Sequence, residues 1–195
     1  MSYVDVPKFA LAIDWETSGF STPNYAEHHQ GISLGAIIFD VKTLEAVEEL
    51  YLEIEFNPKY RWESAAERVH GLSREHLKEN GVTQEVAAVE LCNLIVKYIA
   101  TEDVILLGHR VHFDRAFTDQ LTKSIGIDLN YHPTVIDTAS MSTVLMEMSK
   151  SEEVFQTLGM PPRKTHNALE DIRYTLQSVQ RMKELFFKGI MTELS

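Results

Sequence analysis

The sequence predicts a mixed α/β protein, in which helices pack against a sheet whose strands run in both directions. The first third of the chain reads as three strands joined by short connections, which is typical of an antiparallel meander. The rest alternates helical apolar periodicity with short apolar runs, which is typical of buried strands covered by helices. A chain of 195 residues has room for one hydrophobic core, so we expect residues 1–195 to form a single domain.

The strands are predicted from apolar runs and from the alternation of apolar and polar residues. Phe9–Ile13 is an apolar run that ends in charged residues. Leu50 and Leu52 alternate with Tyr51 and Glu53, which is the period of a half-buried strand. The fourth strand is a continuous apolar run, typical of a strand covered on both faces. The predicted strands are residues 8–16, 32–39, 46–56, 104–108 and 135–137.

The helices are predicted from capping residues and from apolar stripes. Ser73 and Thr83 are expected to cap helices, because their hydroxyls accept hydrogen bonds from the free N–H groups of a first turn. Apolar residues recur at helical spacing after Thr83 and in the last predicted helix. The predicted helices are residues 63–69, a short helix after Ser73, and residues 83–100, 114–124, 139–148 and 167–187, with a loop at Pro161-Pro162.

Composition limits the partners and the setting of the protein. No apolar stretch is long enough to span a membrane, and Met1–Asp5 lacks the pattern of a secretory signal. A single cysteine, Cys92, excludes an intrachain disulfide. We therefore expect a cytoplasmic protein with no membrane partner. The net charge of −11 excludes a broad basic surface for nucleic acid, but not an acidic site that holds nucleic acid through metal ions.

Asp14-Trp15-Glu16 places two carboxylates two residues apart at the end of the first predicted strand. Residues i and i+2 of a strand project from the same face, so the two charges lie side by side. Like charges at this spacing repel unless a cation lies between them, and hard carboxylate oxygens suit Mg²⁺ or Mn²⁺. The alternative is a solvated strand end, since this pair is common on exposed strands.

Two later segments carry residues of the same chemistry. Asp114 follows the predicted strand 104–108 and opens a helix, where it is either a helix cap or a site residue at the carboxyl end of a strand. His166 and Asp171 open the last helix in the pattern H-x-A-x-x-D, in which the alanine leaves room for a close approach. Asp171 would add a carboxylate to a metal site, and His166 would take a proton from water. The alternative is a capping histidine and an exposed aspartate.

In this order, the three segments resemble the DEDD exonuclease superfamily, in its histidine-containing branch. That branch includes the proofreading epsilon subunit of bacterial DNA polymerase III, ribonuclease T and oligoribonuclease. Asp14–Gly19 resembles the family pattern D-x-E-T-T-G, Gly31–Ala36 resembles its second strand, and Val69–Leu72 resembles the H-G-I/L segment of epsilon-like members. The resemblance covers residues 8–182 and implies a ribonuclease H-like α/β fold, with a five-stranded mixed sheet flanked by helices.

The resemblance also implies a reaction and a set of roles. The reaction is hydrolysis of the terminal phosphodiester at a 3′ end, which releases nucleoside monophosphates with the help of two Mg²⁺ or Mn²⁺ ions. Asp14, Glu16 and Asp171 would hold one ion and Asp14 and Asp114 the second, with His166 as general base. The expected substrate contacts are Glu16 and the backbone near Thr17 and Ser18 at the terminal 3′-OH, Val69, His70 and Phe113 against the last bases, and Arg110 at a phosphate; the alternatives are core packing for Val69 and Phe113 and solvent for Arg110.

Some residues depart from the family pattern or stay outside it. Arg110 stands where epsilon-like members often have Asn. His28-His29 lies in a long loop and is expected to be solvated, and Trp15 is expected in the core. His109 and Asp137 are expected to be buried hydrogen-bonding residues, and the basic residues Lys59, Arg61, Arg163 and Lys164 either guide a nucleic-acid strand or are scattered solvated charges.

The predicted substrate is a single-stranded 3′ end, more of DNA than of RNA, because the segment at His70 resembles the epsilon-like group. We expect a stand-alone enzyme or a separate proofreading or repair subunit. The closest alternative is an exoribonuclease for short RNA or RNA 3′ tails, since the same site serves both polymers and the 2′-OH decides between them. A third alternative is a non-catalytic binding or scaffold domain, although all five site positions are filled here.

Overall fold

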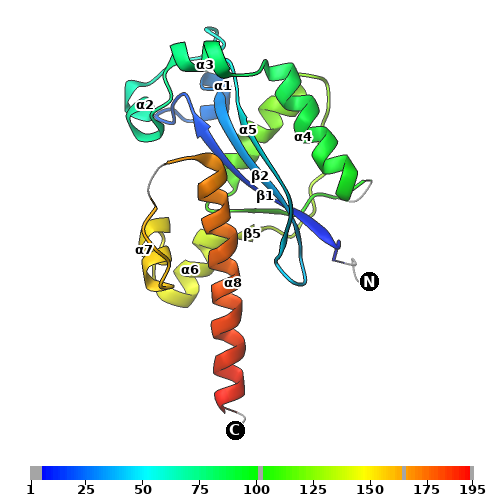
Figure 1. The fold of residues 1–195 in the computed structure, drawn as a ribbon, viewed down its shortest axis with the longest axis vertical. Coiled ribbons are helices and arrows are strands. Elements are labelled where there is room, and N and C mark those ends of the chain that lie inside the picture. The colour runs from blue at the N-terminus through cyan, green and yellow to red at the C-terminus, as the bar shows by residue number, and fades with distance from the viewer. Residues whose placement is uncertain (1–5, 101–102, 164–165, 194–195) are drawn as a thin grey trace.

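One mixed sheet forms the centre of this computed structural model, which describes residues 6–100, 103–163 and 166–193 (Figure 1). Its strands are β1 (Phe9–Thr17), β2 (Gly31–Asp40), β3 (Ala46–Glu53), β4 (Leu106–Gly108) and β5 (Ile136–Asp137). They lie in the order β3-β2-β1-β4-β5. β1 pairs antiparallel with β2, as does β2 with β3, whereas the β1–β4 and β4–β5 pairs are parallel. The predicted fold class, with an antiparallel meander followed by parallel strands, is confirmed.

Helices cover both faces of the sheet (Figure 1). α4 and α5 pack on one face, and the long helix α8 packs on the other. α7 contacts both α6 and α8. Among the described helices, none is both long and apolar enough to cross a membrane. The helices are α1 (Tyr25–His28), α2 (Ser64–His70), α3 (Arg74–Asn80), α4 (Gln84–Tyr98), α5 (His112–Lys123), α6 (Thr138–Met146), α7 (Ser151–Thr157) and α8 (Ala168–Glu193).

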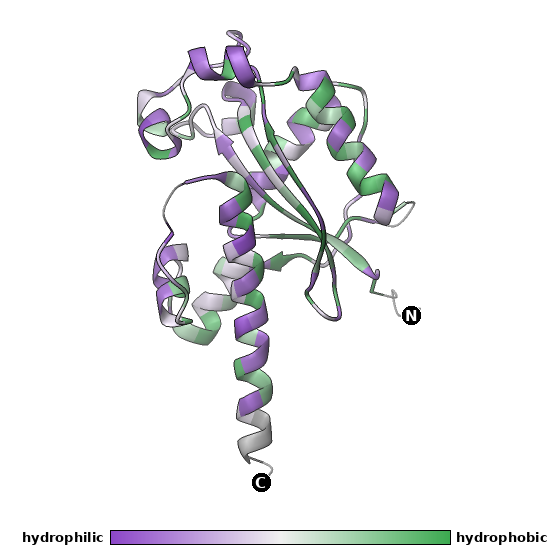
Figure 2. Ribbon diagram, viewed as in Figure 1, coloured by the Kyte–Doolittle hydropathy of each residue, from purple (hydrophilic) through white to green (hydrophobic). Residues whose placement is uncertain are grey.

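The alternation of side chains along β1 decides where its carboxylates point. Leu11 and Trp15 belong to the core under α4 and α5, whereas Ala12 belongs to the core under α8. Asp14 and Glu16 continue the row of Ala12, because side chains two residues apart share a face. Both carboxylates therefore leave the sheet on the α8 side. Figure 2 shows β1 as hydrophobic over most of its length and hydrophilic at its carboxyl end.

Element boundaries differ from the predictions by a few residues, and two helices were not predicted. Ser73 and Thr83 cap α3 and α4 as expected, accepting hydrogen bonds from the backbone N–H groups of His76 and Val86. Val104 forms only an isolated bridge, to Tyr131, so the fourth strand is shorter than predicted. The helices α1 and α7 were missed, because four and seven residues are too few to display a helical period.

Candidate active site

The N-terminus of α8 lies directly against the sheet beside Asp14. Gly35 pairs with Asp14 across β1 and β2. A Cβ atom at Gly35 would lie 2.3 Å from the carbonyl carbon and oxygen of Ala168, so only glycine allows the helix this close. Asn167 caps the helix, its side-chain oxygen accepting from the N–H groups of Leu169 and Glu170 at 3.1 and 3.2 Å. The close approach expected at Ala168 is therefore made by the backbone of β2.

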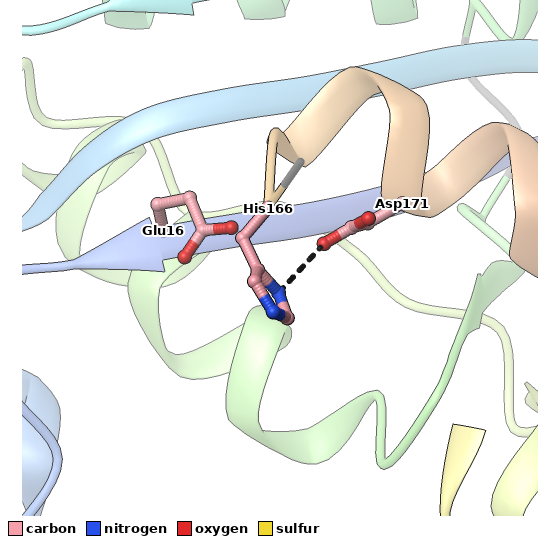
Figure 3. Close-up of side chains that lie close together, drawn as sticks. All are labelled: Glu16, His166 and Asp171. Carbon is pink, nitrogen blue, oxygen red and sulfur yellow. Dashed lines mark ion pairs between the residues drawn. The ribbon is translucent and has the colours of Figure 1, made fainter. Parts of the chain in front are cut away.

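This packing brings Asp171, in the first turn of α8, to the carboxylates of β1. Asp14, Glu16, His166 and Asp171 all line one cavity of about 300 Å³. Ligand atoms of Glu16, His166 and Asp171 lie within 4.8 Å of one another, and Figure 3 shows these three side chains gathered at the end of β1. His166 Nδ1 is 3.8 Å from Asp171 Oδ2, and nearly half of the His166 side chain is exposed.

Asp114, in the first turn of α5, reaches the same strand from the other side. Its side chain is buried, and its Oδ1 accepts a hydrogen bond of 3.1 Å from the backbone N–H of Trp15. Burial and the nearby charge of Asp14 raise the pKa of Asp114 well above its ordinary value. Trp15 is buried as predicted, and its indole donates to Thr118 Oγ1 at 3.1 Å. All five predicted catalytic and metal residues thus converge on the carboxyl end of β1.

The buried carboxylates oppose one another's ionisation. Burial, followed by the charge of Asp171, raises the pKa of Asp14 to about 7. Burial, followed by the charges of Asp14 and Asp171, raises the pKa of Glu16 to about 8. Burial also raises the pKa of Asp171. Carboxylates in this arrangement need a positive partner near neutral pH, and a set of hard oxygen donors with one imidazole fits Mg²⁺ or Mn²⁺.

Arg163 supplies positive charge to the site without being one of the predicted site residues. Its Nη1 lies 2.7 Å from Asp171 Oδ1, and its Nη2 contacts Glu152 Oε1 of α7. Its guanidinium lowers the pKa of Asp14, Glu16 and Asp171 and so opposes the effect of their burial. The expectation of a solvated charge is wrong for Arg163, whose side chain is only 12% exposed. Lys164 lies outside the described residues.

Glu152 had no signal in the sequence, because a glutamate in a short helix looks like ordinary solvated charge. Its side chain is 63% exposed, yet it lines the same cavity as the carboxylates of β1. Only the placement of α7 against α8 brings Glu152 to Arg163.

The first predicted substrate contacts lie at the end of β1, where side-chain groups are already engaged. Thr17 Oγ1 donates to the carbonyl of Gly19 at 3.1 Å. Ser18 is fully buried, donates to the carbonyl of Arg61 at 2.7 Å and accepts from the N–H of Gln30 at 2.9 Å. These bonds hold the turn that follows β1. The backbone of Ser18 is engaged as well, because its N–H donates to the carbonyl of Gln30 at 2.8 Å and its carbonyl accepts from the N–H of Glu63 at 2.7 Å.

The predicted base contacts differ in their exposure. His70 is buried, and burial lowers its pKa, an effect that Glu67 and then the Thr17 backbone partly offset. Val69, beside it, is 49% exposed, which leaves its side chain available to a base. Phe113 is partly buried and packs against Tyr25, with ring centroids 4.6 Å apart.

Arg110 is exposed and holds a left-handed backbone conformation with φ of 62°. Asparagine adopts this conformation more readily than arginine, which gives a physical reason for the Asn expected at this position in epsilon-like members. The arginine therefore carries backbone strain next to the site.

Among the other polar residues, one prediction was wrong. His29 is fully buried, with Nε2 3.2 Å from Glu63 Oε1, because it packs under the loop that follows β1. Nearby, Glu63 also accepts from the N–H of Phe20 at 3.2 Å. His109 and Asp137 are half-buried where burial was expected, but they form the expected hydrogen bonds: His109 Nδ1 lies 3.0 Å from Thr138 Oγ1, and Asp137 Oδ2 accepts from Val111 N–H at 3.0 Å.

Comparison with known proteins adds sequence and structural likenesses. Residues 11–179 match the protein family described as exonuclease. The PolC-type DNA polymerase III proteins of Thermotoga maritima and Thermotoga petrophila are each 27% identical to this chain over 187 residues. That alignment covers 95% of this chain but only 12% of either polymerase.

Solved structures share the fold at low sequence identity. A 3′-exonuclease in a structure of 3′-end recognition of a histone mRNA stem-loop has a TM-score of 0.71 and 14% identity, over 91% of this chain and 82% of that one. Exonuclease I of E. coli with a dA16 oligonucleotide has a TM-score of 0.73 and 16% identity, over 91% of this chain and 41% of that one. These likenesses agree with the five-stranded mixed sheet flanked by helices.

Proposed function

Because the chain belongs to the exonuclease family over residues 11–179, we propose that it hydrolyses terminal phosphodiesters at 3′ ends of single-stranded DNA and releases nucleoside monophosphates. The observation that carries the proposal is the convergence of four buried or half-buried carboxylates and one histidine on the end of β1. Family membership agrees with the predicted resemblance to DEDD exonucleases and with the predicted enzyme class. The polarity of hydrolysis, the two metal ions, the single domain over residues 1–195 and the cytoplasmic setting remain predictions.

Each of the convergent residues has a proposed role. Asp14, Glu16 and Asp171 would hold one divalent ion, and Asp14 with Asp114 would hold a second. Two such ions supply positive charge to the attacking and leaving oxygens when they are bound. The carboxylates of this chain fix where that charge lies, and the mutual repulsion that helps to raise the pKa of Asp14 and of Glu16 is relieved when a cation binds between them.

His166 is proposed to accept the proton of the attacking water. Its Nδ1 lies 3.8 Å from Asp171 Oδ2, which places the imidazole beside the carboxylates of the site. Nε2, on the other side of the ring, would then take the proton. The exposure of His166 allows water to reach it and allows the proton to pass on to solvent after each turnover.

The proposed preference for DNA rests on sequence likeness. The relatives at 27% identity are DNA polymerases of the PolC type, whereas one solved structure that shares the fold recognises the 3′ end of a histone mRNA stem-loop and another holds a dA16 oligonucleotide. Contacts of Val69, His70 and Phe113 with the last bases would tolerate any base sequence, since every base has an apolar face. A net charge of −11 leaves few phosphate contacts, so we expect a short footprint.

RNA is the second candidate substrate. A 3′-exonuclease nuclease domain bound to rAMP shares the fold with a TM-score of 0.71 at 14% identity, which supports the fold and leaves the substrate open. The carboxylate site can serve either polymer, and the contacts made to the 2′-OH would decide. A scaffold role without catalysis is disfavoured by the complete set of five site residues.

The test uses matched DNA and RNA oligonucleotides, labelled at the 5′ end and incubated with Mg²⁺, with Mn²⁺ or with EDTA. A ladder of products shortened from the 3′ end, present only with metal, is the expected result. Asp14→Asn should abolish it. The matched control is Asp128→Asn, at an exposed residue that pairs only weakly with Lys123 at 3.5 Å. If neither polymer is shortened in the presence of metal, the proposal is refuted. If RNA is shortened faster than DNA, RNA is the preferred substrate.

A further inference from the structure

Arg163 lies between a carboxylate of the site and a carboxylate outside it. One guanidinium nitrogen, Nη1, is 2.7 Å from Asp171 Oδ1, and the other, Nη2, contacts Glu152 Oε1. Asp171 is buried and Glu152 is 63% exposed. The guanidinium therefore connects buried Asp171 with exposed Glu152.

The surroundings of Arg163 leave space for the guanidinium to leave Asp171. Arg163 and Glu152 line both the cavity of the carboxylates and a neighbouring cavity of about 470 Å³. The apolar residues that line this second cavity are Phe155, Met160, Pro161 and Pro162. The guanidinium carbon already lies 5.3 Å from the centre of the Phe155 ring, within the range of a cation–π contact.

Arg163 competes for the group that a metal ion would need. Asp171 presents Oδ2 toward His166 but gives Oδ1 to the guanidinium. An arginine keeps its charge at any pH at which the protein is folded, so the guanidinium cannot become neutral when a cation approaches. A divalent cation arriving at Asp171 therefore meets a fixed positive charge, and the repulsion between them is relieved only if the guanidinium moves.

We propose that Arg163 is the built-in counter-ion of the metal-free site, and that a divalent ion displaces its guanidinium from Asp171 onto Glu152 and the Phe155 ring. The inference rests on the proposed metal site. Glu152 is then a positioning residue that holds the displaced arginine close by. Without metal, the positive charge of Arg163 stabilises the folded arrangement of the carboxylates. The same charge lowers the affinity of the site for a divalent ion.

The first experiment measures Mn²⁺ binding by calorimetry at about pH 8.5, above the pKa of Asp14 and of Glu16, so that proton release does not mask the effect. Arg163→Gln should bind Mn²⁺ about tenfold more tightly than the wild type, because one fixed positive charge is removed from the site. The matched control is Arg173→Gln. It removes the same charge from α8, but Arg173 pairs with Glu49 of β3 away from the cavity. This control should bind Mn²⁺ as the wild type does.

The second experiment tests the part played by Glu152. Glu152→Gln should weaken Mn²⁺ binding about threefold in the wild type, because the displaced guanidinium loses its acceptor. The same change in the Arg163→Gln background should have no effect, since the arginine it serves is absent. Glu153→Gln is the control for charge, because Glu153 pairs with Lys150 and does not line the cavity.

Two further readouts do not rely on calorimetry. Thermal unfolding in EDTA should show a lower Tm for Arg163→Gln than for Arg173→Gln, and a larger rise when Mn²⁺ is added. Crystals of the wild-type protein grown with Mn²⁺ should show Arg163 detached from Asp171 and still in contact with Glu152.

The outcomes separate this inference from the proposed function. Wild-type binding of Mn²⁺ with no gain in Arg163→Gln over Arg173→Gln would overturn the inference and leave the metal site intact. An equal effect of Glu152→Gln in both backgrounds would also overturn it, since Glu152 would then act on the metal directly. Absence of Mn²⁺ binding by the wild type would refute the metal site and this inference together.

Discussion

Replacing Gly35 by alanine should move Asp171 of α8 away from Asp14 of β1. The added Cβ would lie 2.3 Å from the Ala168 carbonyl and 2.4 Å from the Leu169 nitrogen. Ordinary contacts begin near 3.4 Å, so either α8 lifts from the sheet by about 1 Å or β2 bends by a similar amount. Both movements displace Asp171 from Asp14, because Gly35 pairs with Asp14 and Asp171 lies one turn into α8.

The magnitude follows from overpacking and from catalytic geometry. Forcing one methyl group into a closed contact costs about 1–3 kcal/mol, which corresponds to a fall in Tm of roughly 3–10 °C for a chain of this size. A displacement of about 1 Å at a catalytic group costs on the order of 10²-fold in rate. We therefore expect Gly35→Ala to lower Tm, to lower kcat at saturating Mn²⁺ and to weaken Mn²⁺ binding.

The assay pairs thermal unfolding in EDTA with turnover of a single-stranded oligonucleotide. Gly189→Ala is the matched control, because it makes the same change in α8 at a position with no atom within 4 Å of the new Cβ. Its Tm should stay level or rise, since alanine favours a helix over glycine by about 0.5–1 kcal/mol. A Gly35→Ala protein with the Tm, kcat and Mn²⁺ affinity of the wild type would refute the claim that this contact positions Asp171.

Three further predictions use the same preparations. In EDTA, Tm should fall as the pH rises from about 5 to about 8.5. Burial raises the pKa of Asp14 from 3.8 to about 7 and of Glu16 from 4.5 to about 8, so the folded state binds more protons than the unfolded state between these pH values. The stabilisation from these protons is complete below the unfolded pKa values and is lost as the pH rises through the folded pKa values. His166→Ala should reduce kcat by about 10²–10⁴-fold and leave Mn²⁺ affinity nearly unchanged, as measured by kinetics and calorimetry. Arg110→Asn should raise Tm by about 2–4 °C, because asparagine relieves roughly 1 kcal/mol of left-handed strain, and should reduce the salt dependence of oligonucleotide binding by about one phosphate contact.

Each of these predictions has an outcome that contradicts it. A flat dependence of Tm on pH in EDTA would mean that the carboxylates of β1 are not held protonated in the folded protein. Loss of Mn²⁺ binding in His166→Ala would make this residue a metal ligand in place of a base. An unchanged salt dependence in Arg110→Asn would leave Arg110 in solvent, without a phosphate partner.

The candidate site is largely predictable because its chemistry is written in short local patterns. The spacing of Asp14 and Glu16 places both on one face of a strand whatever the rest of the chain does. The pattern at His166 and Asp171 opens a helix in the structure as expected. Apolar runs and capping residues likewise predict the five strands and most helices, since these signals depend on neighbours in the chain.

The burial of His29, which sequence reasoning misjudged, depends on a contact across a long stretch of chain. His29 is buried because Glu63, 34 positions away, meets it beneath the loop after β1. No local period or cap announces such contacts.

The donors of the site, and the strand and helix that carry them, can be predicted from short segments of chain, because side-chain chemistry and local periodicity are properties of adjacent residues. The counter-charge of the site becomes visible only in the folded protein. Arg163 reaches Asp171 and Glu152 through the packing of α7 against α8 and of α8 against the sheet. The same packing depends on the missing side chain of Gly35, whose role becomes visible only when α8 is laid upon β2.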